Sequence, residues 1–465
     1  MGQMFTIKAS EAHGRRLDPE YHHALRRTRI RSTYPSAKLL SLSYFRTGGT
    51  PSTAHPEYWN GSIPWVSAKD FKAFRFEDSE DHVTELALAE STTCYVNRPA
   101  VLMVSRSGIL QHTLPVMVTH KPTTINQDIK AFFPDDRVSV DYLGAFFDVF
   151  GSRLLPLVCK SGATVQSLNT EQLMDLSIPL PPLSEQRKIV AELDAAYAAK
   201  RAADEKATKL LASIDDMVLR ELGIVKLPKP DTSLSSRIFT VPAKEVLNDR
   251  FDAHYNQNFF RDLADLIRED KRCCRLGSVG TFVRGVTYKS EDESDCGHAI
   301  LRANNVSLEE FDLDLSDLVH VSSDLAFSPA QQIKDGDILI CAASGSKEHA
   351  GKVAYVRNAP DDTYIGGFMM VLRTDAGVNP EYVAAYMQSS IFRGLIFRHL
   401  GGTNINNVSL ELLNKLPLIL PDVAMQDGIA LKASSIRAEA RKLKADATAA
   451  LDAAKRKIEL KIIEK

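Results

Sequence analysis

The feature that most constrains this chain is a long internal repeat, because a sequence that matches itself at a fixed distance must form one structural unit twice. The matches keep their order along the chain, and their separation grows by only six residues, from 234 to 240. This small drift in one direction is typical of a tandem duplication with short insertions. The matching pairs are Arg16–Tyr21 with Arg250–Tyr255, Val104–Gly108 with Cys341–Gly345, Lys160–Thr164 with His399–Thr403, and Leu168–Pro181 with Val408–Pro421.

The first part of each repeat has the pattern of a mixed α and β domain. Short β-like runs at 101–105, 337–342 and 352–356 stand among turns rich in glycine, proline and asparagine. Amphipathic stretches at 142–150 and 381–397 predict short helices. We therefore expect an α+β fold with two tandem domains, at residues 1–182 and 243–421.

Each repeat ends in a sequence that predicts one long helix, at residues 183–224 and 422–465. Ser184 is the expected N-cap of the first helix, and Gly223 is its expected stop signal. Apolar residues recur with 4–3 spacing from Ile189 and again from Ile429, as in a coiled coil. Because both seams are rich in alanine, we expect an antiparallel helix pair, with residues 225–242 as the linker between repeats. Burial of each helix against its own domain alone is the alternative, which such long runs disfavour.

Charge and composition argue against several classes of protein. The net charge is -2, and residues 243–415 carry 18 Lys and Arg against 25 Asp and Glu, so any DNA surface must be a local patch. The sequence has no membrane-spanning run and no secretory signal. The six cysteines lack zinc spacing and are expected to be reduced thiols of a cytoplasmic protein.

Motifs for catalysis are missing from the sequence. It contains no GxxxxGK[ST], GxGxxG, HExxH or GxSxG pattern, and no Asp/Asn-Pro-Pro-Tyr/Phe segment of an amino-methyltransferase. We therefore expect a non-catalytic chain that binds neither a metal nor a cofactor.

Recognition chemistry is present instead, in glycine-containing loops at matched places of the two repeats. Hydroxyl, amide and basic side chains in such loops suit contacts to phosphates and base edges. Trp65 lies in a strand-like run and is expected in the core, whereas Lys69 is expected near DNA. The candidate DNA-binding residues are Gly48, Gly49, Thr50, Ser67, Lys69, Ser105, Arg106, Ser107, Lys160, Thr164, Arg302, Asn304, Asn305, Ser344, Ser346, Lys347, Thr403 and Asn404.

Two segments carry a resemblance to a known family. Gly48-Gly49-Thr-Pro-Ser, followed by Tyr-Trp-Asn-Gly and Ile-Pro-Trp-Val, and the later run from Ile178 to Ile189 (IPLPPLSEQRKI), resemble specificity subunits of Type I restriction–modification systems. In the second repeat the Glu-Gln-Arg of that run is replaced by Met425-Gln426-Asp427. That departure puts partner contacts of the second helix in doubt.

The resemblance implies two target-recognition domains separated by two long helices, each domain reading one half of a bipartite, asymmetric DNA site. It also implies two modification subunits as partners, which methylate adenine N6 with S-adenosylmethionine, and restriction subunits in some complexes. A coiled-coil scaffold, or an S-like subunit of a different phage-defence complex, is the alternative. The candidate partner-binding residues on the helices are Ile189, Leu193, Leu210, Ile214, Ile436 and Leu443.

Overall fold

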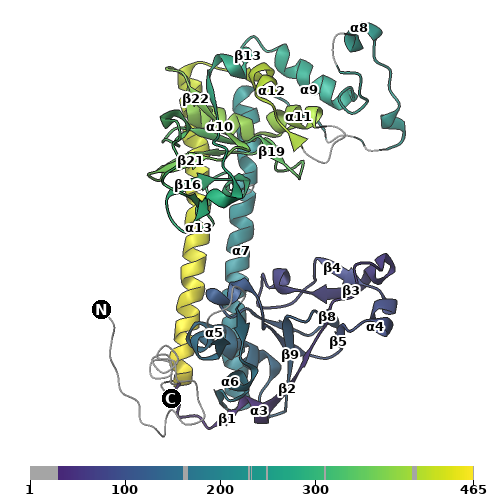
Figure 1. Ribbon diagram of the computed structural model, residues 1–465, viewed down its shortest axis with the longest axis vertical. Coiled ribbons are helices and arrows are strands. Elements are labelled where there is room, and N and C mark those ends of the chain that lie inside the picture. Colours follow the sequence, from purple (N-terminus) through teal and green to yellow (C-terminus); the bar gives the residue numbers. More distant parts are fainter. Residues whose placement is uncertain are drawn as a thin grey trace. The chain divides into compact units, whose positions relative to one another are not determined.

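The computed structural model describes residues 30–160, 166–228, 231, 233–247, 250–307, 310–400 and 406–463. The chain divides into two compact units, the first made of two segments and the second of one. Unit 1 consists of residues 1–203 and 445–465, and unit 2 of residues 204–444. Figure 1 shows the elements of both units, and each unit is described by itself below.

Unit 1 contains two four-stranded sheets and a helix that covers one of them. The first sheet has the order β2-β9-β6-β7 and is antiparallel throughout; the second has the order β4-β3-β8-β5, with β3 and β8 parallel. The elements are β1 (Ser36–Lys38), α3 (Leu39–Leu42), β2 (Ser43–Thr47), η1 (Pro56–Tyr58), β3 (Trp59–Val66), η2 (Ala68–Asp70), β4 (Asp81–Val83), α4 (Glu85–Glu90), β5 (Cys94–Val96), β6 (Ala100–Val104), η3 (Gly108–Gln111), β7 (Val116–Thr119), β8 (Thr123–Ile125), β9 (Ile129–Pro134), α5 (Val140–Val158), β10 (Cys159–Lys160), β11 (Ser167–Leu168), α6 (Thr170–Met174) and β12 (Ser177–Pro179).

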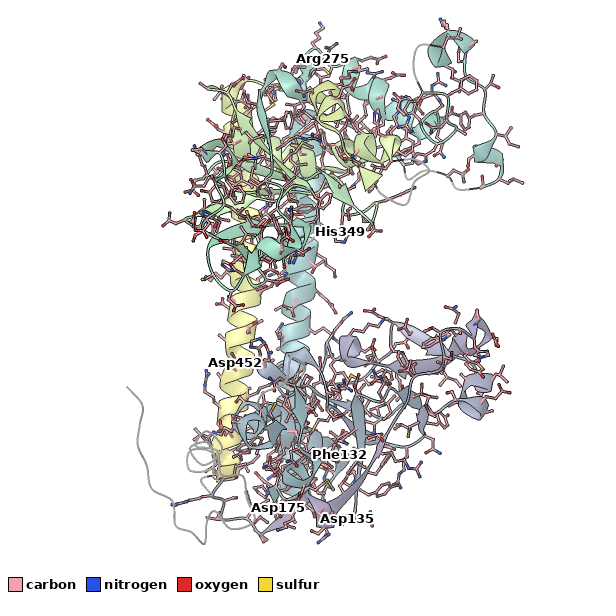
Figure 2. The ribbon with its side chains drawn as sticks, viewed as in Figure 1. Phe132, Asp135, Asp175, Arg275, His349 and Asp452 are labelled. Carbon is pink, nitrogen blue, oxygen red and sulfur yellow. The ribbon has the colours of Figure 1, made fainter. Side chains whose placement is uncertain are left out.

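Strand β6 shows why this unit folds as layers. All five of its residues are buried, because alternate side chains enter different cores. Val101 and Met103 pack with α5, whereas Ala100 and Leu102 pack toward the second sheet. Phe132 of β9, labelled in Figure 2, is fully buried on the α5 side. A strand buried on both faces requires an uninterrupted apolar run, which is what the sequence provides.

Unit 2 repeats this arrangement. Its antiparallel sheet has the order β14-β22-β18-β20, and its second sheet has the order β15-β17-β16-β21, with β16 and β21 parallel. The elements are η4 (Ser235–Arg237), α8 (Ala243–Val246), α9 (Asn258–Arg268), β13 (Cys273–Arg275), η5 (Leu276–Ser278), β14 (Gly280–Arg284), η6 (Ser290–Asp292), β15 (Glu293–Ser294), β16 (His298–Leu301), η7 (Ala303–Asn305), β17 (Val319–Val321), η8 (Pro329–Gln331), β18 (Ile338–Cys341), β19 (Ala343–Ser344), β20 (Val353–Tyr355), β21 (Thr363–Ile365), β22 (Met369–Thr374), α10 (Pro380–Gln388), α11 (Ser390–His399), β23 (Asn406–Asn407), α12 (Leu410–Lys415) and β24 (Pro417–Ile419).

Equivalent hydrogen bonds in the two units confirm the duplication. The Tyr142 hydroxyl donates to the carbonyl of Pro179, and 240 residues later the Tyr382 hydroxyl donates to the carbonyl of Ile419. A buried glutamine, Gln186 or Gln426, accepts from the backbone N–H that precedes α5 or α10, at 2.9 Å in both units. The two repeats therefore share side-chain contacts as well as strand order.

Two long helices, α7 (Leu183–Leu222) and α13 (Val423–Ile463), each contribute residues to both units. In unit 1, Glu192 of α7 forms ion pairs with Lys457 and Lys461 of α13. In unit 2, Glu221 of α7 forms an ion pair with Lys432 of α13. The start of α7 thus pairs with the end of α13, and the end of α7 with the start of α13, so the pair is antiparallel.

The structure corrects three details of the helix predictions. Helix α7 begins one residue before the expected cap, Ser184, and ends at Leu222, where Gly223 has a positive φ of 73° as expected of a stop. The stretch 381–397 is two helices, because Ser389 caps a new helix with its hydroxyl. Near the end of α13 the seam shifts by one residue toward larger side chains, since a straight helix turns every 3.6 residues rather than 3.5. Leu451, Ile458 and Ile462 are buried there, whereas the expected Ala450 and Lys457 are exposed.

The alternative for the helices is also partly right, because both pack into the cores of the units. Ile189 and Leu193 of α7 belong to the core around α5, together with Ile458 and Ile462 of α13. In unit 2, Ile214 lies in a core that includes strands and helices of that unit. The helices therefore pack on each other and on the domains.

Candidate nucleic-acid interface

Backbone hydrogen bonds tie the candidate loops of unit 1 to one another. The N–H of Gly49 donates to the Ile125 carbonyl at 3.1 Å, and the N–H of Ser105 donates to the Asp128 carbonyl at 2.7 Å. The Ser105 carbonyl in turn accepts from the N–H of Leu168 at 2.8 Å. Loops from four parts of the sequence thus form one group, which we call the unit 1 loop cluster: residues 48–50, 105–107, 126–128 and 166–168.

Gly48 and Gly49 serve the packing of this cluster. A Cβ on Gly48 would lie 1.7 Å from the Ile125 carbonyl oxygen, and one on Gly49 would lie 2.2 Å from Thr92 Oγ1. The indole of Trp65 donates to the Gly49 carbonyl at 3.2 Å, and Trp65 is 7% exposed, which confirms the prediction that it belongs to the core. The glycines are thus explained by contacts within the chain. Thr50 is exposed and donates to the side-chain oxygen of Gln127 at 2.5 Å.

Among the three residues after β6, the arginine is the one free to bind. The Ser105 side chain is buried and donates to the Asp128 carbonyl at 2.9 Å, while Ser107 accepts from the Ile109 N–H at 3.4 Å. Arg106 is exposed, and within the described residues its guanidinium has no hydrogen bond or ion pair. A free guanidinium at the tip of a rigid loop suits a phosphate or a guanine edge.

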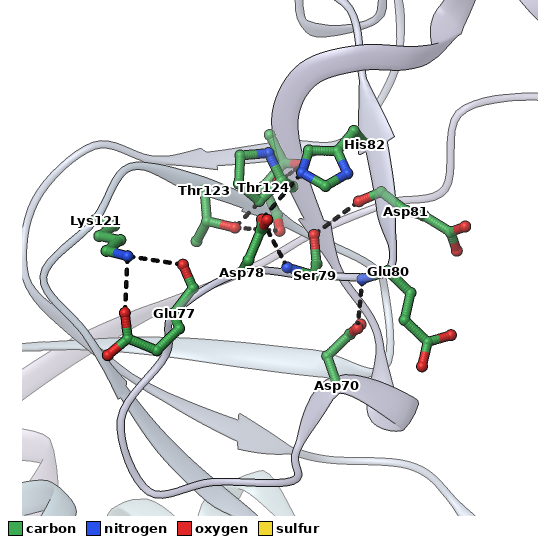
Figure 3. Close-up of polar contacts among 11 residues, drawn as sticks. Asp70, Glu77, Asp78, Ser79, Glu80, Asp81, His82, Lys121, Thr123 and Thr124 are labelled. Carbon is green, nitrogen blue, oxygen red and sulfur yellow. Dashed lines mark hydrogen bonds and ion pairs between the residues drawn. The ribbon is translucent and has the colours of Figure 1, made fainter. Parts of the chain in front are cut away.

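Lys69 differs from what the sequence predicted, because acidic side chains already surround it. Its ammonium lies 2.9 Å from Asp81 and 3.2 Å from Glu80, and these carboxylates raise the pKa of Lys69. Both acids belong to an acidic loop, residues 77–81, drawn in Figure 3 with Lys121 paired to Glu77. A surface cavity of about 320 Å³ is lined by residues of this loop together with others, among them Lys72 and Arg75. The negative field of the acidic loop disfavours a phosphate beside Lys69. A phosphate could bind there only by replacing the carboxylate partners of Lys69, whose exposed ion pairs are weak.

The turn that contains Ser67 and its counterpart in unit 2 is structural. Asp70 accepts from the N–H and the hydroxyl of Ser67, at 2.8 and 3.0 Å. In unit 2, Asn305 accepts from the Arg302 N–H at 2.8 Å and donates to two backbone carbonyls. Because Asn305 is 1% exposed and its amide is fully engaged, it holds a loop in place and is removed from the set of DNA-binding candidates. Asn304 is exposed and is bonded to Asp317 at 2.8 Å.

The loop after β18 matches the loop after β6. The N–H of Ala342 donates to the Phe368 carbonyl at 2.8 Å, as Ser105 does to Asp128, and the Ala342 carbonyl accepts from Val408. Ser344 pairs with a residue of β23, and its hydroxyl accepts from the Ser346 N–H at 3.2 Å. Ser346 and Lys347 are exposed.

Four candidates remain without a described side chain. The side chain of Lys160 and the whole of Thr164, Thr403 and Asn404 lie outside the described part of the chain. The sequence also did not single out Arg284 and Phe368, which are exposed beside the loop after β18. Only their position relative to the repeat could have indicated them.

Three of the six helix residues expected to bind partners fill cores of the chain itself. Ile189, Leu193 and Ile214 are between 0% and 6% exposed, and a side chain that fills a core offers no surface to another protein. Leu210, Ile436 and Leu443 are half-buried and stay candidates. Exposed apolar residues of α13, such as Leu431 and Leu460, are better placed for that role.

Within the described ranges, no group of three His, Cys, Asp or Glu side chains could hold a metal ion. No helix in that part of the structure is long and apolar enough to cross a membrane. The sulfur of Cys341 is buried, which raises the pKa of its thiol.

Comparison with known proteins identifies the first domain. Residues 35–210 match the family described as the Type I restriction modification DNA specificity domain. This part of the chain is similar to that family, and the match covers less than half of the chain. The specificity domain thus covers both sheets of unit 1, the loop cluster and most of α7, and unit 2 repeats its architecture.

Relatives of the specificity domain carry the same description. The chain is 39% identical over 148 residues to the Type I restriction enzyme EcoR124I/EcoR124II specificity subunit of Escherichia coli, covering 32% of this chain and 37% of that protein. It is 35% identical over 174 residues to the StySPI specificity subunit of Salmonella potsdam, covering 37% of each. The chain thus matches little more than a third of the length of these relatives. The solved S subunit of M. genitalium aligns over 93% of this chain and 96% of its own, at 12% identity and a TM-score of 0.40.

Proposed function

We propose that this chain is the DNA sequence-recognition subunit of a Type I restriction–modification complex. The observation that carries the proposal is the structural duplication of a specificity domain, with the same loops tied together by the same backbone bonds and filled with different side chains. A repeated scaffold with altered loops is suited to two different half-sites. Each unit would read one half of a bipartite, asymmetric sequence.

The residues proposed to contact DNA are those that are exposed at the loop clusters. In unit 1 they are Thr50 and Arg106, and in unit 2 they are Ser346 and Lys347. Lys69 contributes only if it exchanges its carboxylate partners for a phosphate. Since the chain has a net charge of -2, we expect weak binding by the chain alone and tight binding in the complex.

The proposed partners are two modification subunits, and restriction subunits where a system has them. The chain itself is proposed to be non-catalytic and to bind no cofactor, while the modification subunit uses S-adenosylmethionine. Adenine N6 inside a duplex is reached only after the base is flipped out, so the pocket for it would belong to that partner. The proposed location of the complex is the cytoplasm.

An exchange of domains tests the proposal. Residues 243–415 are replaced by the equivalent domain of a relative, and methylated adenines are mapped in DNA treated with the assembled complex. We expect one half-site to change and the other to stay the same. A change in both half-sites, or complexes that methylate without sequence preference, would refute two independent readers. If the chain were a scaffold that binds only proteins, the exchange would not change which DNA sequence is methylated.

A further inference from the structure

Phe368 is the side chain of unit 2 that its fold explains least. It is 74% exposed, in the loop between β21 and β22, and among the described residues no aromatic ring contacts it. An exposed phenyl ring forgoes the favourable free energy that its burial would contribute. A single exposed apolar residue is common on proteins, so the case depends on how this one is held and what surrounds it.

The backbone holds Phe368 rigidly at the tip of its loop. Its carbonyl accepts two hydrogen bonds, from the N–H of Ala342 at 2.8 Å and from the N–H of Ala343 at 3.3 Å. On the other side, the N–H of Gly285 donates to the Met369 carbonyl at 3.1 Å. The two glycines before it are packed tightly, since a Cβ on Gly366 would lie 2.7 Å from a carbonyl oxygen. The ring therefore projects from a loop whose backbone is held by hydrogen bonds on both sides.

Two cationic side chains lie on segments next to this loop. Arg284 lies opposite Met370 in the β14–β22 register, two residues from Phe368, and Lys347 follows the strand whose N–H bonds the Phe368 carbonyl. Both are exposed, and within the described part of unit 2 neither side chain forms an ion pair. This is notable in a domain with an excess of acids, where Lys289, Arg357 and Arg373 are all paired. An exposed apolar ring in a loop with unpaired cations on neighbouring segments suits a polyanion with flat bases.

We propose that Phe368 stacks on or wedges into a base step of the half-site read by unit 2, with Arg284 and Lys347 on the flanking phosphates. This rests on the proposed function and adds a specific contact to it. Aromatic stacking and apolar wedges between base steps are established ways for proteins to hold and bend nucleic acid. The equivalent position of unit 1 is Asp128, whose carbonyl has the same backbone role. An acid cannot stack, so unit 1 reads its half-site without this distortion.

The test uses the complete complex with its modification subunits, and duplexes that carry 2-aminopurine at successive positions of the half-site assigned to unit 2 by the domain exchange. The methylated adenine is left out of the scan, because flipping also raises the fluorescence. The wild-type complex should give an increase in 2-aminopurine fluorescence at one base step. Phe368→Ala should lose it and weaken binding roughly 5- to 100-fold. Phe368→Trp should retain both, and Phe251→Ala, which removes another phenyl ring of unit 2 that is 85% exposed, should behave as wild type.

Two results would overturn the inference. One is a Phe368→Ala complex that binds and fluoresces as wild type does. The other is a variant that fails to assemble with the modification subunits in the absence of DNA, which would make Phe368 a protein contact. A wild-type complex without any sequence preference would instead refute the proposed function. The half-site of unit 1 is an internal control, since its specificity should be unchanged in every variant.

Discussion

The buried glutamine at the start of each long helix provides a matched pair of tests for how the fold is held. Gln186 is fully buried; its side chain accepts from the Ser139 N–H at 2.9 Å and donates to the carbonyls of Arg137 and Pro181, at 3.1 and 2.9 Å. Gln426 makes only two such bonds, from the Asn379 N–H at 2.9 Å and to a proline carbonyl at 2.8 Å. Truncation to alanine therefore leaves three backbone groups without this partner in unit 1 and two in unit 2, and in each unit the proline carbonyl among them is in a buried bond.

At about 1 kcal/mol for each lost bond and more for a group that stays dry, Gln186→Ala should cost about 3–4 kcal/mol and Gln426→Ala about 2–3 kcal/mol. Both tryptophans of the chain, at positions 59 and 65, lie in unit 1. In urea unfolding of the full chain, tryptophan fluorescence therefore reports on unit 1, whereas circular dichroism reports on both units. We expect Gln186→Ala to shift the fluorescence transition and Gln426→Ala to shift mainly the circular dichroism. A loss below about 1 kcal/mol for Gln186→Ala, or a larger loss for Gln426→Ala, would contradict the role assigned to the pair.

Three further predictions concern the helices and the loops. The pKa of Glu192 is held below its ordinary value of 4.5 by two lysines of α13, so its contribution to stability is present above pH 4.5 and is lost as the pH falls through the lowered pKa; Glu192→Gln should lower the urea midpoint at pH 7 and lower it less at pH 3. In the assembled complex, Arg106→Ala should weaken DNA binding more than Lys69→Ala, because only Lys69 is already paired with carboxylates; equal losses in a binding titration would count against this. Four residues inserted after Ala203 add about 6 Å to α7, and mapping of methylated sites should then show the gap between unchanged half-sites lengthened by one or two base pairs; an unchanged gap would exclude the helices as the spacer.

The repeat in the sequence was enough to predict the architecture, because its ordered matches fall on residues that make the same bonds twice. Leu168 and Val408 are an example, since each donates its N–H to the carbonyl of the residue that follows β6 or β18. The continuous apolar runs of β6 and β18 also marked the central strands correctly. Secondary structure and burial leave a periodic pattern of apolar residues in the sequence, and such a pattern can be recognised without a structure.

Whether a side chain is free to bind DNA leaves no periodic pattern in the sequence. Lys69 and Arg106 look equally suitable in the sequence, yet the acids that pair with Lys69 are 11 and 12 residues further along the chain. Asn305 has the composition of a base reader, but its amide is used up by carbonyls of a loop that passes over it. Most seam residues of α7 and α13 are buried or half-buried, but the sequence could not tell whether another protein or the chain's own core covered them. Phe368 was missed because exposure is a property of the tertiary fold.

The glutamine bonds also bear on how such a chain acquires a new specificity. Every partner of Gln186 and Gln426 is a backbone atom, which any sequence supplies. Recombination that joins the first part of one domain to the long helix of another therefore restores the contact, provided that the helix brings its glutamine. If the chain reads DNA as proposed, a whole recognition domain can be exchanged for another while the backbone contacts of this junction are kept.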